Sequence, residues 1–157
     1  MPPPLYDVLL ILHVATALIG FGSIAVGGLY ARRGAASPAP SGEDRLVRFF
    51  APGVDWPARL IFVVPALGLA MLLGGDRPAV GHLWPWLGLA IWFLAAGVAT
   101  ARTWPAEKRA QRALSDLAAG EADGLARFRL ACRQMEGAAA VVALCFVAVV
   151  ALMIVQP

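Results

Sequence analysis

The residues of this sequence that could carry chemistry are two histidines and two methionines, all within or beside apolar stretches: His13, His82, Met71 and Met153. Imidazole and thioether groups together suit copper, and Cu(I) above all. Two histidines on facing helices could instead ligate a haem iron, in which case Arg77 could reach the haem propionates. Whether these side chains meet depends on the elements that carry them.

Each of these residues also has an interpretation without a ligand. Methionine is a common apolar filler, and a histidine beside a tight turn, such as His82, can serve as an interfacial polar residue. His13 lies inside an apolar stretch, where an ionisable group is a functional candidate by default. Its alternative role is a hydrogen bond to a Ser, a Thr or a carbonyl of a neighbouring helix.

The composition is that of a membrane domain. The chain has 157 residues, of which 60% are hydrophobic and only 15% charged, and its mean hydropathy is +0.72. A soluble domain of this size carries more charge. The net charge of +3 and the pI of about 9.4 do not indicate nucleic-acid binding, because the lysines and arginines are concentrated in the connections that the positive-inside rule places in the cytoplasm. We expect no cleavable signal peptide, since the N-terminus lacks a positive region.

Four apolar stretches are long enough to cross a bilayer as helices. The first covers residues 8–30, and a helix of that length rises roughly 34 Å. The others cover 57–75, 83–101 and 137–155, and a polar helix over 105–119 precedes the last one. The sequence therefore predicts an all-α fold. We expect one membrane domain, an antiparallel bundle of four transmembrane helices with a helical cytoplasmic connection.

Small residues and bulky residues lie on opposite sides of the first stretch. The small side allows helix backbones to approach closely in lipid, and it also carries His13, which should therefore face protein. We expect the bulky side to face lipid tails. The small side holds His13, Thr16, Ala17, Gly20, Ser23, Ile24 and Gly27, and the bulky side holds Leu10, Val14, Leu18, Phe21 and Val26.

Prolines and glycines mark the ends of the predicted helices. We expect Pro2–Pro4 to hold the N-terminus out of a helix, and Trp56–Pro57 and Trp104–Pro105 to begin helices, because proline suits the first helical turn. Pro65 should kink the second span. Gly120 should stop the polar helix. A new helix then begins near residue 121 and runs into the last span.

The first connection contains a loop and a short helix. Residues 34–42 are a loop by composition. Residues 43–50 are expected to form an interfacial helix capped by Ser41, with Leu46, Phe49 and Phe50 dipping into the headgroups. Elsewhere, Cys132 and Cys145 lie on one predicted helix, too far apart to form a disulfide with each other.

The distribution of cations predicts the threading. Of the 13 lysines and arginines, only Arg77 lies in the second connection and all the others lie in the first and third. Cytoplasmic loops are the ones enriched in these residues. Both termini should therefore lie outside, and His13, Met71, His82 and Met153 should gather in the outer part of the bundle.

Two polar features are expected on the cytoplasmic side. Arg133 and Glu136, with Arg59 and Arg102, could form a cluster that either makes interface salt bridges or guides a proton or an anion. The basic helix that contains the sequence EKRAQRAL should lie at anionic lipid headgroups or meet a partner protein. The lipid bilayer is thus the first partner, and a membrane-protein partner or a second copy of the chain is the next.

The first span resembles a known group of proteins. Leu12 and His13 in the motif LHVA, followed by residues 27–33 ending in YARR, make the chain similar to small four-helix bacterial integral membrane proteins of unknown function. These are similar to the copper-resistance D-type membrane domain and, more distantly, to HemJ-type protoporphyrinogen oxidases. The resemblance implies a haem-associated role for His13. The W-x-A-G-L-F-Y-L-P-R signature of those oxidases is absent from this chain.

These observations favour a multi-pass protein of the plasma (inner) membrane that is not catalytic, either an accessory subunit or a binding protein. The alternative is a haem b or copper protein that works through His13 and His82 on its outer side. A small transporter is a third reading, and four spans would then have to oligomerise to line a path.

Overall fold

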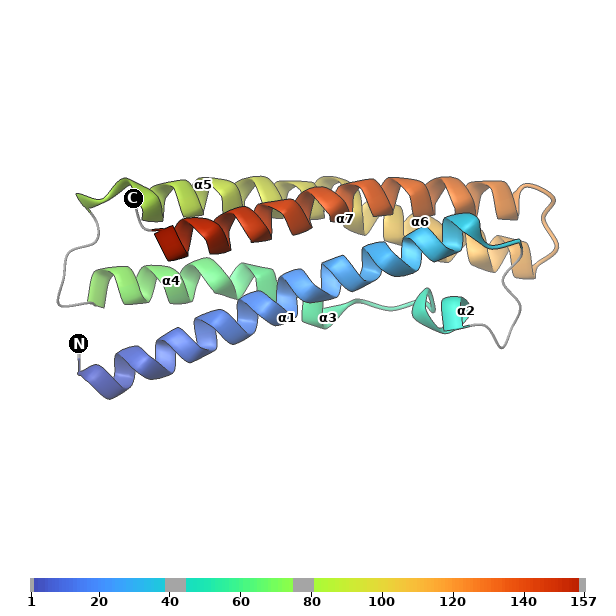
Figure 1. Cartoon of the computed structure of the whole chain (residues 1–157). Coiled ribbons are helices and arrows are strands. Elements are labelled where there is room, and N and C mark those ends of the chain that lie inside the picture. The colour runs from blue at the N-terminus through green and yellow to red at the C-terminus, as the bar shows by residue number, and fades with distance from the viewer. Residues whose placement is uncertain (1, 39–44, 75–80, 156–157) are drawn as a thin grey trace. The chain divides into compact units, whose positions relative to one another are not determined.

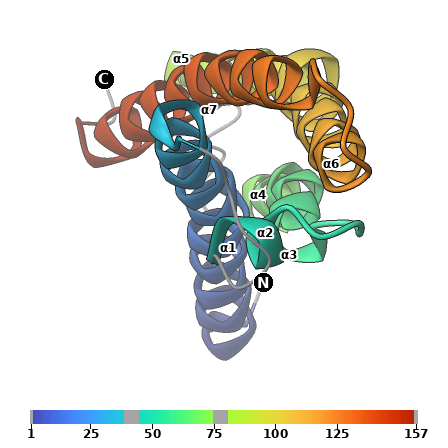
Figure 2. The same cartoon turned by 90° about the vertical axis from the view of Figure 1, so that its right-hand side faces the viewer.

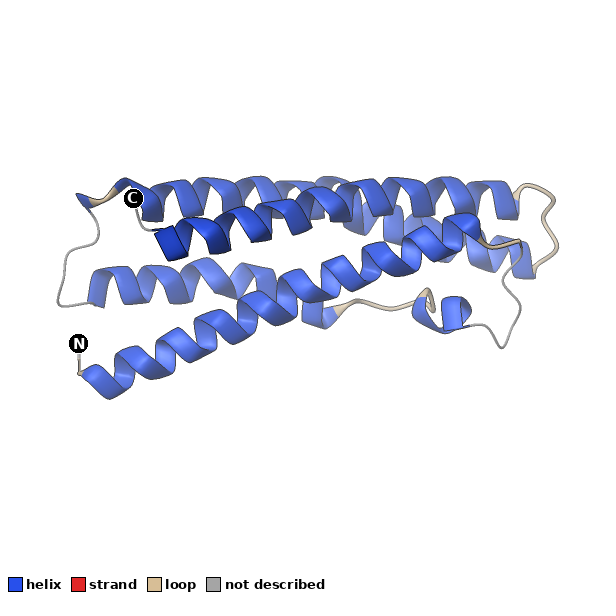
Figure 3. Ribbon diagram, viewed as in Figure 1, coloured by secondary structure: helices blue, strands red, loops and turns tan. Residues whose placement is uncertain are grey.

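The structure, a computed structural model, describes residues 2–38, 45–74 and 81–155. Within these ranges it consists of helices joined by short turns and contains no strand (Figure 3). Four helical runs are long and apolar enough to cross a membrane: Pro3–Ala36, Trp56–Gly74, Leu83–Ala118 and Gly124–Val155. The all-α class predicted from the sequence is confirmed for the described residues, as are four helices long and apolar enough to cross a membrane.

The chain divides into two compact units, to both of which α1 and α7 contribute; Figure 1 labels the helices. The first unit comprises residues 1–23, 55–96 and 143–157, and the second comprises 24–54 and 97–142. The elements in chain order are α1 (Pro3–Ala36), α2 (Arg45–Phe49), α3 (Trp56–Arg59), the 3₁₀ segment η1 (Leu60–Phe62), α4 (Val63–Gly74), α5 (Leu83–Val98), the π-helical segment η3 (Ala99–Thr103), α6 (Trp104–Ala118) and α7 (Gly124–Val155).

Helix α1 is longer at both ends than the sequence predicts. It begins at Pro3, so the expectation that Pro2–Pro4 stay outside a helix is wrong. The amides of Leu5 and Tyr6 both donate to the carbonyl of Pro2. Prolines are tolerated here because the first amides of a helix have no intrahelical partner to lose. At the other end, residues 34–36 continue the helix instead of opening a loop.

In the first unit, a proline leaves a backbone carbonyl without its usual helical donor, and a tryptophan side chain donates to that carbonyl instead. Asp55 caps the start of α3, its Oδ1 accepting from the amide of Ala58 at 3.3 Å. Pro65 has no N–H to give to the carbonyl of Ile61, four residues earlier. Trp92 of α5 donates its Nε1–H to that carbonyl at 2.8 Å. The 3₁₀ segment η1 lies immediately before this point.

The small side of α1 lies against the η1 backbone in this unit. A Cβ added at Gly20 would come 2.7 Å from the amide nitrogen of Ile61, so only glycine fits there. Phe21 is only 4% exposed and stacks on Phe146 of α7 with ring centroids 4.9 Å apart. The expectation that Phe21 faces lipid is therefore wrong, because a neighbouring ring is available to cover it.

In the second unit, glycines of α1 meet a stripe of α7. A Cβ at Gly28 would come 2.7 Å from Cβ of Ala139, and one at Gly34 would come 2.9 Å from Sγ of Cys132. Residue numbers rise along α1 as they fall along α7, so the two segments run in opposite directions in this contact. Both cysteines of the chain are free and buried.

Helix α2 packs into the core of the second unit, and the expectation that it dips into headgroups is wrong. Leu46 and Phe50 are buried in a cluster that also contains Phe128. The rings of Phe50 and Phe128 meet edge to face at 5.5 Å, and Phe49 stacks on Tyr30 of α1 at 4.2 Å. These aromatic partners remove the side chains from any lipid surface. Ser41, the expected cap, lies outside the described residues.

Helices α5 and α6 form one uninterrupted helical run. The amide of Trp104 donates to the carbonyl of Ala99, five residues earlier. This wider turn accommodates Pro105, whose ring in an α-helix would clash with the carbonyl four residues before it. Trp104–Pro105 thus begins α6 as predicted, but without a break after α5.

The turn between α6 and α7 follows the prediction closely. Gly120 has φ +84°. Its amide donates to Leu117, and that of Glu121 donates to Asp116, the pair of bonds that closes a helix at a glycine. Gly124 then lies so close to the α6 backbone that a Cβ would come 2.8 Å from Cα of Leu117. From there α7 continues to Val155 without interruption.

The tryptophan bond can be tested by a double-mutant cycle. Trp92→Phe leaves the Ile61 carbonyl without its donor, so we expect a loss of about 1 kcal/mol in the free energy of unfolding. In Pro65→Ala the new amide of residue 65 can donate to that carbonyl, so Trp92→Phe should cost less in this background. Unfolding in mixed micelles at increasing denaturant measures both costs.

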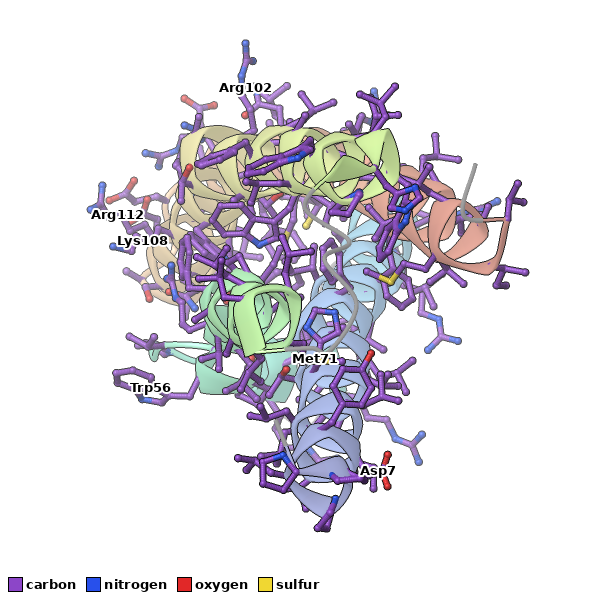
Figure 4. The ribbon with its side chains drawn as sticks, turned by 90° about the vertical axis from the view of Figure 1, so that its left-hand side faces the viewer. Asp7, Trp56, Met71, Arg102, Lys108 and Arg112 are labelled. Carbon is purple, nitrogen blue, oxygen red and sulfur yellow. The ribbon has the colours of Figure 1, made fainter. Side chains whose placement is uncertain are left out.

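Trp56→Phe is the matched control, because Trp56 is 73% exposed and points away from the helices in Figure 4. It should leave stability nearly unchanged. Equal costs of Trp92→Phe with and without Pro65 would show that the bond does not depend on the proline.

Candidate functional sites

His13 lies where the sequence predicts, on the protein-facing side of α1. It is 8% exposed, and its Nδ1 lies 3.0 Å from the carbonyl oxygen of Val64 in α4. A carbonyl can only accept, so Nδ1–H is the donor. This is the hydrogen bond to a carbonyl of a neighbouring helix that the sequence offers as the alternative to a ligand role.

Gly68 makes room for the imidazole. It follows Val64 by one turn of α4, and a Cβ added there would come 3.1 Å from Cε1 of His13. The ring therefore lies against the backbone of α4 between these two residues. With its proton on Nδ1, the neutral imidazole keeps its lone pair on Nε2, the arrangement in which a histidine binds a metal while its other nitrogen is held by a carbonyl.

The other predicted ligands that the structure describes are more exposed than His13. Met71 is half-buried, lies on the same side of α4 as Gly68 by helical spacing, and is seen between α4 and α1 in Figure 4. His82 is exposed, and Met153 is 37% exposed. Arg77 lies outside the described residues. Within the described ranges, no three His, Cys, Asp or Glu side chains are grouped so as to hold a metal ion.

A second site lies in the second unit, along α6, η3 and α7. These helices are joined by the turn at the end that faces the viewer in Figure 2. An open cleft of about 1030 Å³ runs along them. We call it the arginine groove and define it by its charged residues, Arg102, Arg109, Arg112, Asp116, Arg127 and Arg133.

The positive charge of the arginine groove is mostly uncompensated. Asp116 and Glu121 both pair with Arg127, the former at 3.3 Å. Arg109 donates to the neutral amide oxygen of Gln134 at 2.9 Å. The remaining arginines, Arg102, Arg112 and Arg133, are exposed and have no ion pair or side-chain hydrogen bond with any described residue.

The groove changes character along its length. Except for Arg102, which is adjacent to Ala101, the charged residues lie toward the turn that joins α6 to α7. The far end is lined by Val98 and Ala101 on one side and by Ala138 and Val141 on the other. Those α7 residues belong to the stretch from residue 137 onward that carries no charged side chain. The site thus offers four of its five guanidinium groups at one end and a mostly apolar surface at the other.

The sequence identified only part of this groove. Arg102 and Arg133 were expected in a polar cluster, and both line the groove. Glu136 instead lies 3.9 Å from Arg32 of α1, and Arg59 belongs to the first unit. The spacing of Arg102, Arg109 and Arg112 on one side of a helix is a signal that could have indicated the site.

Comparison with protein-family models, with curated proteins and with solved structures finds no match for this chain.

The packing of His13 on Gly68 gives a second prediction. Gly68→Ala puts a methyl group against the imidazole and should lower the free energy of unfolding by about 1 kcal/mol, because a tightly packed ring has to shift. In a His13→Ala background the same change should cost less, since the ring is gone. Thermal unfolding of the four variants in detergent measures the coupling.

Gly22→Ala is the control on α1, where an added Cβ meets no described atom within 4 Å. It should be neutral or stabilising, as expected for Gly→Ala in a helix. A cost of Gly68→Ala that does not depend on His13 would contradict the contact.

Proposed function

We propose that this chain is a multi-pass protein of the plasma membrane that works by binding, as an accessory subunit or a small binding protein, and not by catalysis. Its four long helices would form an antiparallel transmembrane bundle with both termini outside. The observation that carries the proposal is the exposure of large apolar side chains on these four helices. Examples are Leu18, Leu73, Phe93 and Leu144, which are 56%, 70%, 62% and 70% exposed. Surfaces of this kind are stable when lipid covers them.

Helix directions within each unit support the bundle. In the first unit His13 lies opposite Val64, and Gly20 lies opposite Ile61, so α1 and the run from η1 to α4 have opposite directions. In the second unit α1 and α7 run oppositely through Gly28 and Ala139. Alternation of this kind is what four consecutive crossings produce.

The positions of the cations support the orientation. All the lysines and arginines lie in the second unit except Arg59 and Arg77. The side of the membrane rich in these residues is cytoplasmic. The connection from α1 to α3 and the hairpin of α6 and α7 would then be inside. The chain termini and the α4–α5 connection would be outside.

Cysteine labelling in intact cells tests this topology. We expect Ser37→Cys to resist a membrane-impermeant maleimide until the cells are permeabilised, and Ala79→Cys, outside the described residues, to react at once. The unmodified chain is the control, because its own two cysteines are buried. Labelling of Ser37→Cys from outside would overturn the orientation.

A haem or copper protein is the second candidate, favoured by one observation. The Nδ1–H of His13 is held by a carbonyl, which leaves Nε2 as a ligand nitrogen, and Met71 lies one turn from the Gly68 contact. His13 and Met71 would hold Cu(I), and His13 with His82 would hold a haem. Neither requires residues other than those already expected from the sequence.

Purification after growth with added copper or haem precursor tests the second candidate. A Soret band or stoichiometric copper that is lost in His13→Ala but kept in Gly22→Ala, the neutral variant on the same helix, would establish it. A colourless and metal-free protein, unchanged by His13→Ala, would refute the cofactor and favour the non-catalytic binding function.

A further inference from the structure

The arginine groove has the chemistry of a lipid-binding site. We propose that it binds one anionic phospholipid, with the phosphate between Arg112 and Arg133 and the acyl chains along Val98, Ala138 and Val141. The proposal rests on the proposed function, because it needs the apolar end of the groove to lie in the bilayer and the charged end at its cytoplasmic face.

Charge complementarity selects an anion. Five arginines line the groove together with one aspartate, and that aspartate is already paired with Arg127. Three of the arginines have no acidic partner among the described residues, so like charges oppose each other across the groove. A phosphate would relieve this repulsion and would accept several hydrogen bonds, since a guanidinium presents paired N–H groups to phosphate oxygens.

The change from charged to apolar lining selects a lipid over a free anion. A free phosphate would use only the arginine end. A phospholipid matches both ends in the order the helices impose, because Val98 and Ala101 precede Arg112 by three to four helical turns on the same run. On α7, Arg133 is likewise followed by Ala138 and Val141. Small residues there, Gly137 and Ala138, leave space for chains to lie against the backbone.

The side chains can reach such a ligand. Arg112 is exposed and extends away from the ribbon in Figure 4, and Arg133 is also exposed. Long arginine stems lie along apolar surface while their charged ends seek the headgroup layer. Juxtamembrane cations of this kind bind anionic lipid by electrostatic attraction. Arginines fixed along a groove add the selectivity that a diffuse basic surface lacks.

Lipid-dependent thermal stability of the full-length protein in neutral detergent tests the proposal. Dioleoyl phosphatidylglycerol should raise the melting temperature at lower concentration than dioleoyl phosphatidylcholine or sodium phosphate. In the variant Arg112→Gln/Arg133→Gln, the apparent affinity for phosphatidylglycerol should fall at least about tenfold, because two charge-assisted hydrogen bonds are lost.

The matched control is Arg45→Gln/Arg48→Gln, which removes the same charge from exposed residues of α2 that do not line the groove. Its affinity for phosphatidylglycerol should change less than about twofold, since the charges removed do not contact the lipid. Equal losses in both variants would show diffuse attraction and overturn the site. Equal stabilisation by sodium phosphate would show a site for free anions. Equal stabilisation by phosphatidylcholine would show that the site does not distinguish anionic from neutral lipids. Either result also overturns the proposal.

A third variant covers the case in which the arginine substitutions unfold the protein. Ala138→Trp keeps every arginine and fills the apolar end, so it should weaken phosphatidylglycerol binding without changing the response to sodium phosphate. Unchanged lipid affinity in Ala138→Trp would refute the chain contact. Carbonate extraction separates this failure from failure of the proposed function. If the protein stays in the membrane after carbonate treatment but does not discriminate between lipids, only the proposed lipid site is refuted. If carbonate releases the protein, both the lipid site and the proposed function are refuted.

Discussion

The close approach of the α1 backbone to its neighbours is the contact on which both units depend. At Gly20 the neighbour is the backbone of Ile61, and at Gly28 and Gly34 it is Ala139 and Cys132 of α7. In lipid there is little hydrophobic gain from pairing two apolar helices, so dispersion contacts at short range have to hold them. A methyl group at Gly20 or Gly28 would push the backbones apart, and one at Gly34 would displace the side chains of Cys132 and Phe128.

The next constraint is that each backbone carbonyl within these helices needs a hydrogen-bond donor, and it is most evident near Pro65 and Pro105. Pro65 leaves the Ile61 carbonyl to Trp92, and Pro105 is accommodated by the π-helical turn that ends at Thr103. In hydrocarbon an unpaired carbonyl costs more than in water, so each interruption is answered locally by a side chain or by a change of helical hydrogen bonding.

Hydropathy and helix-capping rules predicted most of the helices. They failed where a contact with a residue distant in the sequence determines whether a side chain is buried. Hydropathy located the four long helices, and Gly120 stopped α6 as expected. The sequence also placed His13 on the buried side of α1 because small residues share that side. It misplaced Phe21 and Phe50, since an exposed ring and a covered ring look alike until Phe146 or Phe128 is known to lie beside them. For the same reason only Arg102 and Arg133 of the arginine groove were expected in one cluster, because the groove exists only when α6 and α7 lie side by side.

The wide turn over Ala99–Thr103 has a consequence for how this chain can vary. One residue more or less in a helix turns every later side chain by about 100° around the axis. The direction in which Arg109 and Arg112 point is therefore set by the length of this turn as well as by their own spacing. A deletion here would leave the composition of α6 intact yet rotate its charged side away from α7. Residue count in this short segment should therefore vary far less than residue identity.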